Sequence, residues 1–254
     1  MNEHSKSGAQ SAASKGDLKI LHLYPRDMNI YGDNGNVQVL QKRIGWHGYT
    51  PIVIDYNPGD VLPELSDIDI VIGGGGQDSG QNIIQDDLSG IGEKLKFASE
   101  DGTPMLMVCG MYQLFGKKFV TNAGDTIPGI NIFDIETTGG SERLVGNIVV
   151  NSDTFGTIVG YENHSGQTKL GKTATPLGSV ILGAGNNSTD GHEGTINNNT
   201  IGTYLHGPIL PKNPVIADFL ISTAAKRRFG HFEENTIDDS IAMAAKKVAK
   251  SRPR

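Results

Sequence analysis

Short apolar runs alternate with longer amphipathic stretches along the first half of the chain. The runs apolar enough to form buried strands are residues 19–24, 51–54, 68–72 and 105–108. Between them, apolar residues recur at helical spacing over residues 34–44 and 79–99, and Asn34 is expected to cap the first of these helices. Strands that alternate with helices predict an α/β fold, in which helices flank a mostly parallel central sheet with right-handed crossovers.

The pattern changes after residue 120 to short β-rich segments separated by turn residues. These segments are residues 130–136, 144–150, 157–162 and 180–182. They predict a mixed or antiparallel extension of the same sheet. Residues 186–199 are polar and are expected to form a surface loop, and a last strand over residues 201–205 then leads to His206.

One folded domain is expected, with a tail at each end. Residues 1–16 are rich in Ser, Ala, Gly and Lys without periodicity, which predicts a disordered tail. The domain itself is expected over residues 17–232 and ends with a helix over residues 215–229. Residues 233–254 are expected to add a C-terminal helix over residues 237–250 and a basic tail, for which solvation is the commoner outcome.

Composition excludes several classes of protein. Only 37% of the 254 residues are hydrophobic, and no apolar run approaches the roughly 18 residues that span a membrane. The net charge of -6 argues against a nucleic-acid-binding protein. A single cysteine excludes an internal disulfide framework and fits a reducing cytoplasm.

That cysteine stands where a buried strand meets a helix-like stretch. Residues 105–108 are apolar, Cys109 follows them, and Gly110 opens the next segment. The pattern is typical of a nucleophile elbow, in which a sharp turn presents a thiol at the N-terminus of a helix and the backbone N–H groups favour the thiolate. The alternative is a buried cysteine that packs as a small apolar side chain.

Two further features are expected at the same edge of the sheet. His206 also follows a strand, which suits a general base for the Cys109 thiol. The glycine run at residues 73–76 ends another strand, and its N–H groups, with that of Gly110 or Met111, could form an oxyanion hole. Taken singly, such a histidine is more often structural and such a glycine run is more often a tight turn. Their joint placement favours catalysis.

No nucleotide or metal site is evident in the sequence. The glycine-rich segments match neither a P-loop nor a dinucleotide fingerprint in spacing. Metal binding has weak support, because the remaining histidines lack a ligand spacing. They are His22, His47, His164, His192 and His231, besides His4 in the N-terminal tail.

Five segments resemble one family of enzymes. Similarity to class I glutamine amidotransferases of the cobyric acid synthase type is carried by residues 72–78 (IGGGGQD), 108–113 (VCGMYQ) and 202–211 (GTYLHGPILP). Similarity to the glutaminase subunits of lipid II isoglutaminyl synthases is carried by residues 141–150 (SERLVGNIVV) and 152–164 (SDTFGTIVGYENH). The resemblance covers residues 18–232 and implies a flavodoxin-like fold.

The resemblance also implies an activity and a partner. L-glutamine would be hydrolysed through a thioester, and the ammonia would pass to a Mur-ligase-like catalytic subunit in a cytoplasmic heterodimer. That partner would amidate the D-glutamate of lipid II, a step of peptidoglycan biosynthesis. The complex would thereby contribute to cell wall biogenesis and cell shape. ATP and Mg²⁺ would bind to the partner, and this subunit would need no cofactor. The acceptor lipid II is membrane-bound, but no direct insertion of this chain is expected.

Family motifs assign roles to individual residues. Cys109 would be the nucleophile and His206 the base, which later returns a proton to the leaving ammonia. Arg143 matches the position that grips the glutamine carboxylate, although by itself it would be taken for a surface ion pair. The oxyanion-hole candidates are Gly75, Gly76 and Gly110. Gln113 would support the nucleophile from behind.

The sequence departs from many class I amidotransferases at one position. They carry a glutamate two residues after the histidine, where this chain has Pro208. One hypothesis is that the partner subunit supplies the missing carboxylate across the interface. The competing explanation is an acid elsewhere in this chain, such as Asp27 or Glu162.

Two other functions are compatible with the same sequence. The first is a glutaminase subunit for another acceptor, such as a cobyrinate-like one, although such subunits are ordinarily fused to an ATP-binding domain that is absent here. The second is a non-catalytic subunit that retains the fold and stabilises a ligase. The presence of both Cys109 and His206 argues against the second.

Overall fold

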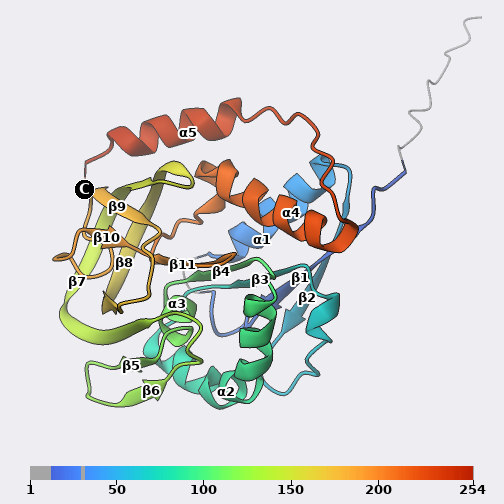
Figure 1. Ribbon diagram of the computed structural model, residues 1–254. Coiled ribbons are helices and arrows are strands. Elements are labelled where there is room, and N and C mark those ends of the chain that lie inside the picture. The colour runs from blue at the N-terminus through green and yellow to red at the C-terminus, as the bar shows by residue number, and fades with distance from the viewer. Residues whose placement is uncertain (1–12, 30–31, 254) are drawn as a thin grey trace, which may run out of the picture.

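The computed structural model describes residues 13–29 and 32–253, and residues 1–12 of the expected tail lie outside this range. The described residues form two six-stranded sheets with helices packed around the first (Figure 1). No helix in this part of the chain is long and apolar enough to cross a membrane.

The central sheet is mostly parallel, as predicted. Its strand order is β11-β12-β4-β3-β1-β2, and only β11 runs antiparallel to its neighbour. Every residue of β3, β4 and β12 is buried, which explains why these strands read as continuous runs in the sequence. The strands are β1 (Asp17–Leu23), β2 (Thr50–Tyr56), β3 (Ile70–Gly73), β4 (Met105–Val108), β11 (Thr195–Asn197) and β12 (Thr200–Thr203).

Helices cover both faces of this sheet. Figure 1 shows α1 (Asn34–Trp46) and α4 (Pro214–Phe229) on one face, with α2 (Asp78–Glu100) and α3 (Gly110–Leu114) on the other. Short 3₁₀ turns are η1 (Leu65–Asp67) and η2 (Leu210–Lys212). One detail differs from the prediction: Asn34 is the first helical residue of α1, and Asp33 occupies the N-cap position. Asp33 caps no backbone N–H of α1 with its side chain, so its carboxylate is available for other partners.

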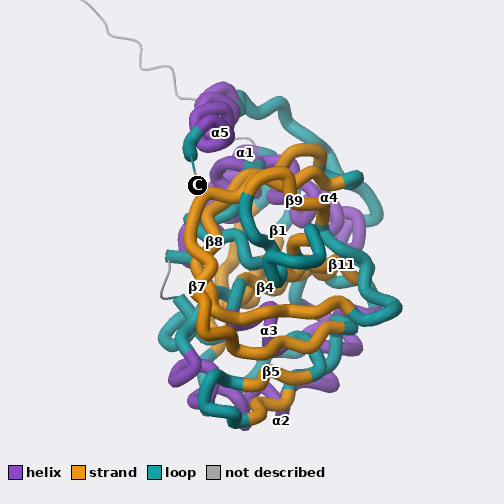
Figure 2. Tube along the Cα trace, turned by 90° about the vertical axis from the view of Figure 1, so that its left-hand side faces the viewer, coloured by secondary structure: helices purple, strands orange, loops and turns teal. Residues whose placement is uncertain are grey.

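The β-rich segment forms a second sheet and does not extend the first. In Figure 2 the long strands β7 and β8 run side by side past the central sheet. Its strands are β5 (Lys118–Val120), β6 (Thr126–Pro128), β7 (Ile135–Ser152), β8 (Gly156–Leu170), β9 (Gly178–Leu182) and β10 (His192–Glu193). The predicted strand at residues 130–136 is mostly loop, because Ile130 N–H and Ile132 N–H donate to Leu114 and Phe115 carbonyls at the end of α3 (2.9 Å each).

The predicted surface loop at residues 186–199 was also wrong. It contains β10 and β11, and the side chains of Asn186 and Glu193 are fully buried. Asn186 satisfies the backbone of Gly194 in both directions, accepting its N–H at 2.9 Å and donating to its carbonyl at 3.1 Å. Polar composition misled the prediction because these groups find hydrogen-bond partners inside the protein.

The C-terminal helix α5 (Ser240–Ser251) lies at the top of Figure 1. The residue before it, Asp239, is held by Arg43 of α1, whose guanidinium also binds Asp218 of α4, each at 2.6 Å. None of the residues of α5 is buried. The segment is fixed by the ion pairs at its start and, near its end, by Asn147 of β7, whose Nδ2 donates to the Ala249 carbonyl at 2.5 Å.

Candidate active site

Cys109 lies on a strained turn between β4 and α3. Its backbone angles are φ 53° and ψ -106°, a region that a non-glycine residue rarely occupies. The Cys109 N–H donates to the Thr203 carbonyl at 2.8 Å, so the turn is held by the neighbouring strand β12. Strain of this kind persists only where the surrounding structure imposes it. The predicted elbow is therefore present, with the thiol carried by a backbone that packing holds in place.

His206 stands where the two sheets meet. It follows β12 of the central sheet, and its backbone pairs with Tyr161 of β8 through two hydrogen bonds of 2.8 and 3.2 Å. Cys109 and His206 are 5% and 2% exposed, so both side chains are shielded from solvent. Parallel strands β4 and β12 thus deliver the two residues to one edge, as the sequence predicted.

The glycine run owes its composition to close packing. Residues 73–76 all have φ outside the left-handed region, so a tight turn does not explain them. A Cβ at Gly75 would lie 2.8 Å from His206 Cε1 and 3.1 Å from the Cys109 Cβ. Cβ atoms at Gly74 and Gly76 would overlap Met28. Only backbone fits between the nucleophile candidate, its base and the loop after β1.

The oxyanion-hole candidates differ in whether their N–H groups already have an acceptor within the protein. The Gly75 N–H donates to the Asp33 carboxylate at 2.7 Å, and the Met111 N–H points to the Gly74 carbonyl at 3.4 Å. Neither N–H is therefore directed at a substrate oxygen in this arrangement. Gly110 begins α3, where N–H groups lack intrahelical partners. A Cβ at Gly110 would lie 3.1 Å from the Gly76 nitrogen, so the backbones of these two candidates approach each other closely.

Asp33 is a site residue that the sequence analysis missed. Its Oδ1 lies 3.6 Å from His206 Nδ1, and each side chain is 3% exposed. Burial by itself lowers the pKa of His206, but the charges and hydrogen bonds of Cys109 and Asp33 outweigh it and raise this pKa from 6.5 to about 10. The arrangement therefore favours the imidazolium form of His206.

Each of the two acids proposed from the sequence has contacts other than those of Asp33. Glu162 accepts N–H bonds from Ala184 at 2.8 Å and Gly185 at 2.9 Å. Asp27 contributes its backbone carbonyl to the packing of Gly76 and Gly80. Because Asp33 stands far from His206 in sequence and its partner contact arises only on folding, no local motif could have identified it.

Arg143 of β7 and Cys109 line the same cavity. The cavity has a volume of about 400 Å³ and is lined by Cys109, Gln113, Arg143, His164 and neighbouring residues. The exposed Arg143 donates from Nε to the Asn163 Oδ1 at 2.7 Å. A cavity of this volume, lined by both a guanidinium group and a thiol, has room for a small amino acid.

Gln113 joins a buried hydrogen-bond network behind Cys109. Its Oε1 accepts from Gln81 Nε2 at 2.8 Å, and its Nε2 donates to the Tyr204 hydroxyl at 3.0 Å. The Tyr204 hydroxyl also lies 2.6 Å from Thr168 Oγ1 of β8. The network connects α2, α3 and β8 to the residue two positions before His206. Through Gln81, whose Nε2 also donates to the Gly110 carbonyl at 3.1 Å, the network reaches the elbow backbone.

The ionisation of Glu193 is expected to make the free energy of unfolding depend on pH. Burial raises its pKa from 4.5 to about 8, although the carboxyl group accepts the Tyr204 N–H at 2.7 Å. Since the folded-state pKa exceeds the unfolded one, the contribution of Glu193 is fully present below about pH 4.5 and is lost as pH rises towards 8. Relative to Glu193→Gln, the wild type is expected to lose on the order of a few kcal/mol of unfolding free energy over this interval.

Urea unfolding of both proteins across this pH interval measures the effect. Glu136→Gln is a suitable control, because Glu136 is half exposed and pairs with Lys118 at the surface. Parallel pH dependences for the wild type and Glu193→Gln would show that Glu193 is ionised in the folded chain.

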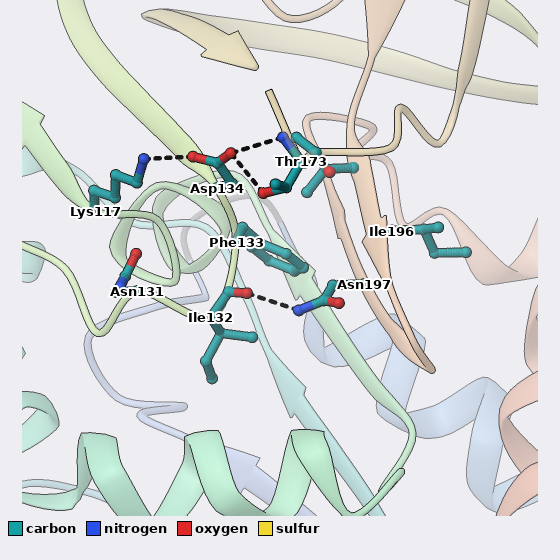
Figure 3. Close-up of a pocket in the computed structure, with 10 residues that line it drawn as sticks. Lys117, Asn131, Ile132, Phe133, Asp134, Thr173, Ile196 and Asn197 are labelled. Carbon is teal, nitrogen blue, oxygen red and sulfur yellow. Dashed lines mark hydrogen bonds and ion pairs between the residues drawn. The ribbon is translucent and has the colours of Figure 1, made fainter. Parts of the chain in front are cut away.

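A second cavity, of about 420 Å³, lies away from Cys109 (Figure 3). In this cavity Lys117 forms an ion pair with Asp134. Asp134 also accepts hydrogen bonds from the Thr173 N–H at 2.9 Å and from the Thr173 hydroxyl at 2.7 Å. These bonds fasten the loop before β7 to the loop after β8. In the described part of the chain, no group of three or more His, Cys, Asp or Glu residues could hold a metal ion.

Comparison with known proteins gives a consistent result. Residues 19–214 match the profile of the CobB/CobQ-like glutamine amidotransferase domain. The chain is 42% identical, over 91% of its length and 94% of the relative, to a Staphylococcus aureus (strain N315) protein named lipid II isoglutaminyl synthase (glutamine-hydrolyzing) subunit GatD. It is 38% identical to the protein of the same name from Streptococcus pneumoniae (strain ATCC BAA-255 / R6), over 84% of this chain and 82% of that one.

Among solved structures, the fold is similar to a glutamine amidotransferase from Thermotoga maritima. The TM-score is 0.52 at 15% identity, with 92% of this chain and 93% of that one covered. At this identity the likeness concerns the fold alone. It confirms the predicted α/β architecture.

Proposed function

Because this chain belongs to the CobB/CobQ-like glutamine amidotransferase family, we propose that it hydrolyses L-glutamine as the glutaminase subunit of a lipid II isoglutaminyl synthase. The finer assignment is supported by the 42% identity to the Staphylococcus aureus subunit, which extends over nearly the whole of both chains. This extent also disfavours the cobyrinate-like alternative. The single observation that supports glutamine hydrolysis most strongly is the buried pair of Cys109 and His206, of which Cys109 lines a cavity together with Arg143.

The proposed reaction begins with proton transfer from the Cys109 thiol to His206. The thiolate then attacks the side-chain amide carbon of glutamine, and the carbonyl electron pair moves onto oxygen to give a tetrahedral oxyanion. N–H groups of Gly76 and Gly110 are the donors proposed to stabilise it, each contributing about 3 kcal/mol by analogy with measured cases. When the oxyanion collapses, the C–N bond breaks and His206 returns its proton to the leaving ammonia.

Hydrolysis of the thioester completes the cycle. His206 takes a proton from water, the hydroxide attacks the thioester carbonyl, and glutamate leaves as the Cys109 sulfur departs. The same base therefore acts in both halves of the reaction. Burial of the pair keeps the imidazolium and thiolate away from bulk water, which strengthens their mutual attraction.

The ammonia is proposed to pass to a Mur-ligase-like partner in the cytoplasm. That partner would bind ATP and Mg²⁺, activate the D-glutamate carboxylate of membrane-bound lipid II and form the amide. The name of the Staphylococcus aureus relative, a subunit of a synthase, supports a two-subunit arrangement for this chain.

Ammonia release from L-glutamine tests the proposal directly. The chain is assayed alone and together with the Mur-ligase-like protein, with lipid II and ATP supplied to the complex. Release of ammonia that is stimulated by the partner is the expected result. A chain that binds the ligase but releases no ammonia in any combination would instead be a non-catalytic stabilising subunit.

Arg143 is proposed to bind the α-carboxylate of glutamine. Replacement by lysine keeps the charge but removes the two-pronged hydrogen-bond geometry that matches a carboxylate. The KM for glutamine is therefore expected to rise by about tenfold or more while kcat changes little, because carboxylate binding is equal in the ground and transition states. Steady-state kinetics of Arg143→Lys give both constants.

Arg227→Lys is the control for that substitution. Arg227 lies on α4 and pairs with Asp101 at 2.6 Å, away from the Cys109 cavity. Both constants of this variant should match the wild type. An unchanged KM in Arg143→Lys would assign Arg143 to a surface ion pair.

A further inference from the structure

One buried carboxylate contacts both the candidate base and the glycine run. Asp33 occupies the N-cap position of α1, yet its side chain caps no N–H of that helix. Its two oxygens have different partners. Oδ2 accepts the Gly75 N–H at 2.7 Å, and Oδ1 faces His206 Nδ1 at 3.6 Å.

Burial raises the cost of leaving the Asp33 carboxylate unpaired. The Asp33 and His206 side chains are each 3% exposed, and an ionised carboxylate in such a place needs a compensating partner. The 3.6 Å separation is within ion-pair range and longer than a hydrogen bond. Contacts between catalytic groups are commonly long before substrate binds and shorten in the complex.

Gly75 lies among the three groups. A Cβ there would lie 2.8 Å from His206 Cε1, 3.1 Å from the Cys109 Cβ and 3.3 Å from Asp33 Oδ2. The Gly75 amide therefore fixes one oxygen of Asp33, and the other oxygen is left on the side of His206. A carboxylate held in this way has a defined direction, which is what the orientation of an imidazole requires.

We propose that Asp33 is the positioning residue for His206. Its Oδ1 accepts from Nδ1–H, which leaves Nε2 to exchange the proton with Cys109, and its Oδ2 ties this orientation to the Gly75 amide. The role rests on the proposed glutaminase function. It supplies within this chain the carboxylate that Pro208 replaces after the histidine.

Other titratable groups also surround His206. They come from the elbow, from β8 and from β10: Cys109, Glu162, His164 and Glu193. His164 and Glu193 interact electrostatically with His206, and Glu162 follows Tyr161, which pairs with the His206 backbone. A test of Asp33 must therefore separate its effect from that of Glu162.

Asp33→Asn is the informative variant. The asparagine oxygen can still accept the Gly75 N–H, but the amide NH₂ group then faces His206 and favours the wrong tautomer. We expect kcat for glutamine hydrolysis to fall about 100-fold or more, with KM changed less than about threefold. The alkaline limb of the pH profile should move down by at least about one pH unit, because an anion that stabilises the imidazolium has been removed.

Asp69→Asn is a closely matched control. Asp69 is also buried, accepts a backbone N–H from Lys19 at 2.7 Å, and pairs through its other oxygen with Arg228 at 2.7 Å. It precedes β3, at the end of the strand opposite to Gly73. This variant should lose stability without a shift of the pH profile, which distinguishes a positioning role from a structural one.

A second readout does not depend on glutamine turnover. The ultraviolet absorbance of the Cys109 thiolate, followed against pH in the full chain, reports the ion pair directly, and nitrogen NMR of the wild type reports the His206 tautomer. In Asp33→Asn, the imidazolium should lose its proton at a lower pH than in the wild type. The thiolate–imidazolium pair should therefore persist over a narrower pH range. If Asp33→Asn fails to fold, a wild-type His206 protonated on Nε2 instead of Nδ1 when neutral overturns the proposal.

The remaining outcomes are equally decisive. Asp33→Asn with unchanged kcat and pH limb, alone and in the complex with the Mur-ligase-like protein, would contradict the proposal. A shift in Glu162→Gln without one in Asp33→Asn would assign the role to Glu162. If the wild type hydrolyses no glutamine but Asp33→Asn still alters the thiolate absorbance, the proposed function fails and the positioning of His206 stands.

Discussion

Replacing Cys109 by alanine is expected to reduce glutamine hydrolysis by about 10⁴-fold or more, because the proposed mechanism has no alternative nucleophile. The alanine retains the Cβ that packs against Gly75, so the variant should fold and bind glutamine. It also retains the strained backbone of the elbow, with φ at 53°. Ammonia release, measured for the chain alone and in the complex with its ligase, is the appropriate assay.

The composition of the chain makes this experiment specific. Cys109 is the single cysteine among the 254 residues, so alkylation of the full chain by iodoacetamide reports on this position alone. Labelling should be complete in the wild type and absent in Cys109→Ala. Met107→Leu, a change of similar volume in the preceding strand, serves as the control for packing near the elbow. Hydrolysis that survives in Cys109→Ala would return this cysteine to the role of a core residue.

Replacing His206 by asparagine is expected to have the second-largest effect, a loss of about 10³-fold in kcat, since both the base and the later acid are removed. The raised pKa of His206, about 10, means that the imidazolium persists through neutral pH and pairs with the thiolate. Without it, the thiol must ionise with no imidazolium beside it. Alkylation of Cys109 at neutral pH should therefore slow, and should recover as the pH is raised.

His231→Asn provides the matched control, because His231 is well exposed and pairs with Glu233 at the surface. Its alkylation profile should coincide with that of the wild type. The mechanism would be contradicted by a His206→Asn variant that keeps both the wild-type pH profile of alkylation and its hydrolysis rate. The two substitutions should also be strongly non-additive, since nucleophile and base act as one unit.

The second sheet shows where local patterns stop being informative. Alternating segments correctly indicated β structure between Thr121 and Tyr204, but they could not say which sheet these strands join. That choice depends on pairing partners far along the chain, as when β5 pairs with β7 in parallel and β8 pairs with the His206 backbone. This pairing bears on the candidate site, because β7 carries Arg143, which lines the Cys109 cavity.

Buried polar residues were misjudged for a related reason. Residues 186–199 look like a surface loop because Asn, Thr, Asp and Gly dominate them, yet Asn186 and Glu193 are fully buried. Their partners are the Gly194 backbone, the Thr203 hydroxyl and the Tyr204 N–H. Composition measures the cost of burying polar groups but not the hydrogen bonds that offset it.

The sequence by itself determined the parallel core, the Cys109 elbow and the edge at which His206 lies. These features depend on hydrophobic periodicity and on the rule that parallel strands end at one edge, both of which act locally along the chain. Only the tertiary structure decided the contacts of Asp33, the engagement of the Gly75 N–H and the cavity between Cys109 and Arg143. Each of these joins residues distant in sequence, and the direction of a buried side chain is set by packing and hydrogen bonding that exist only in the folded chain.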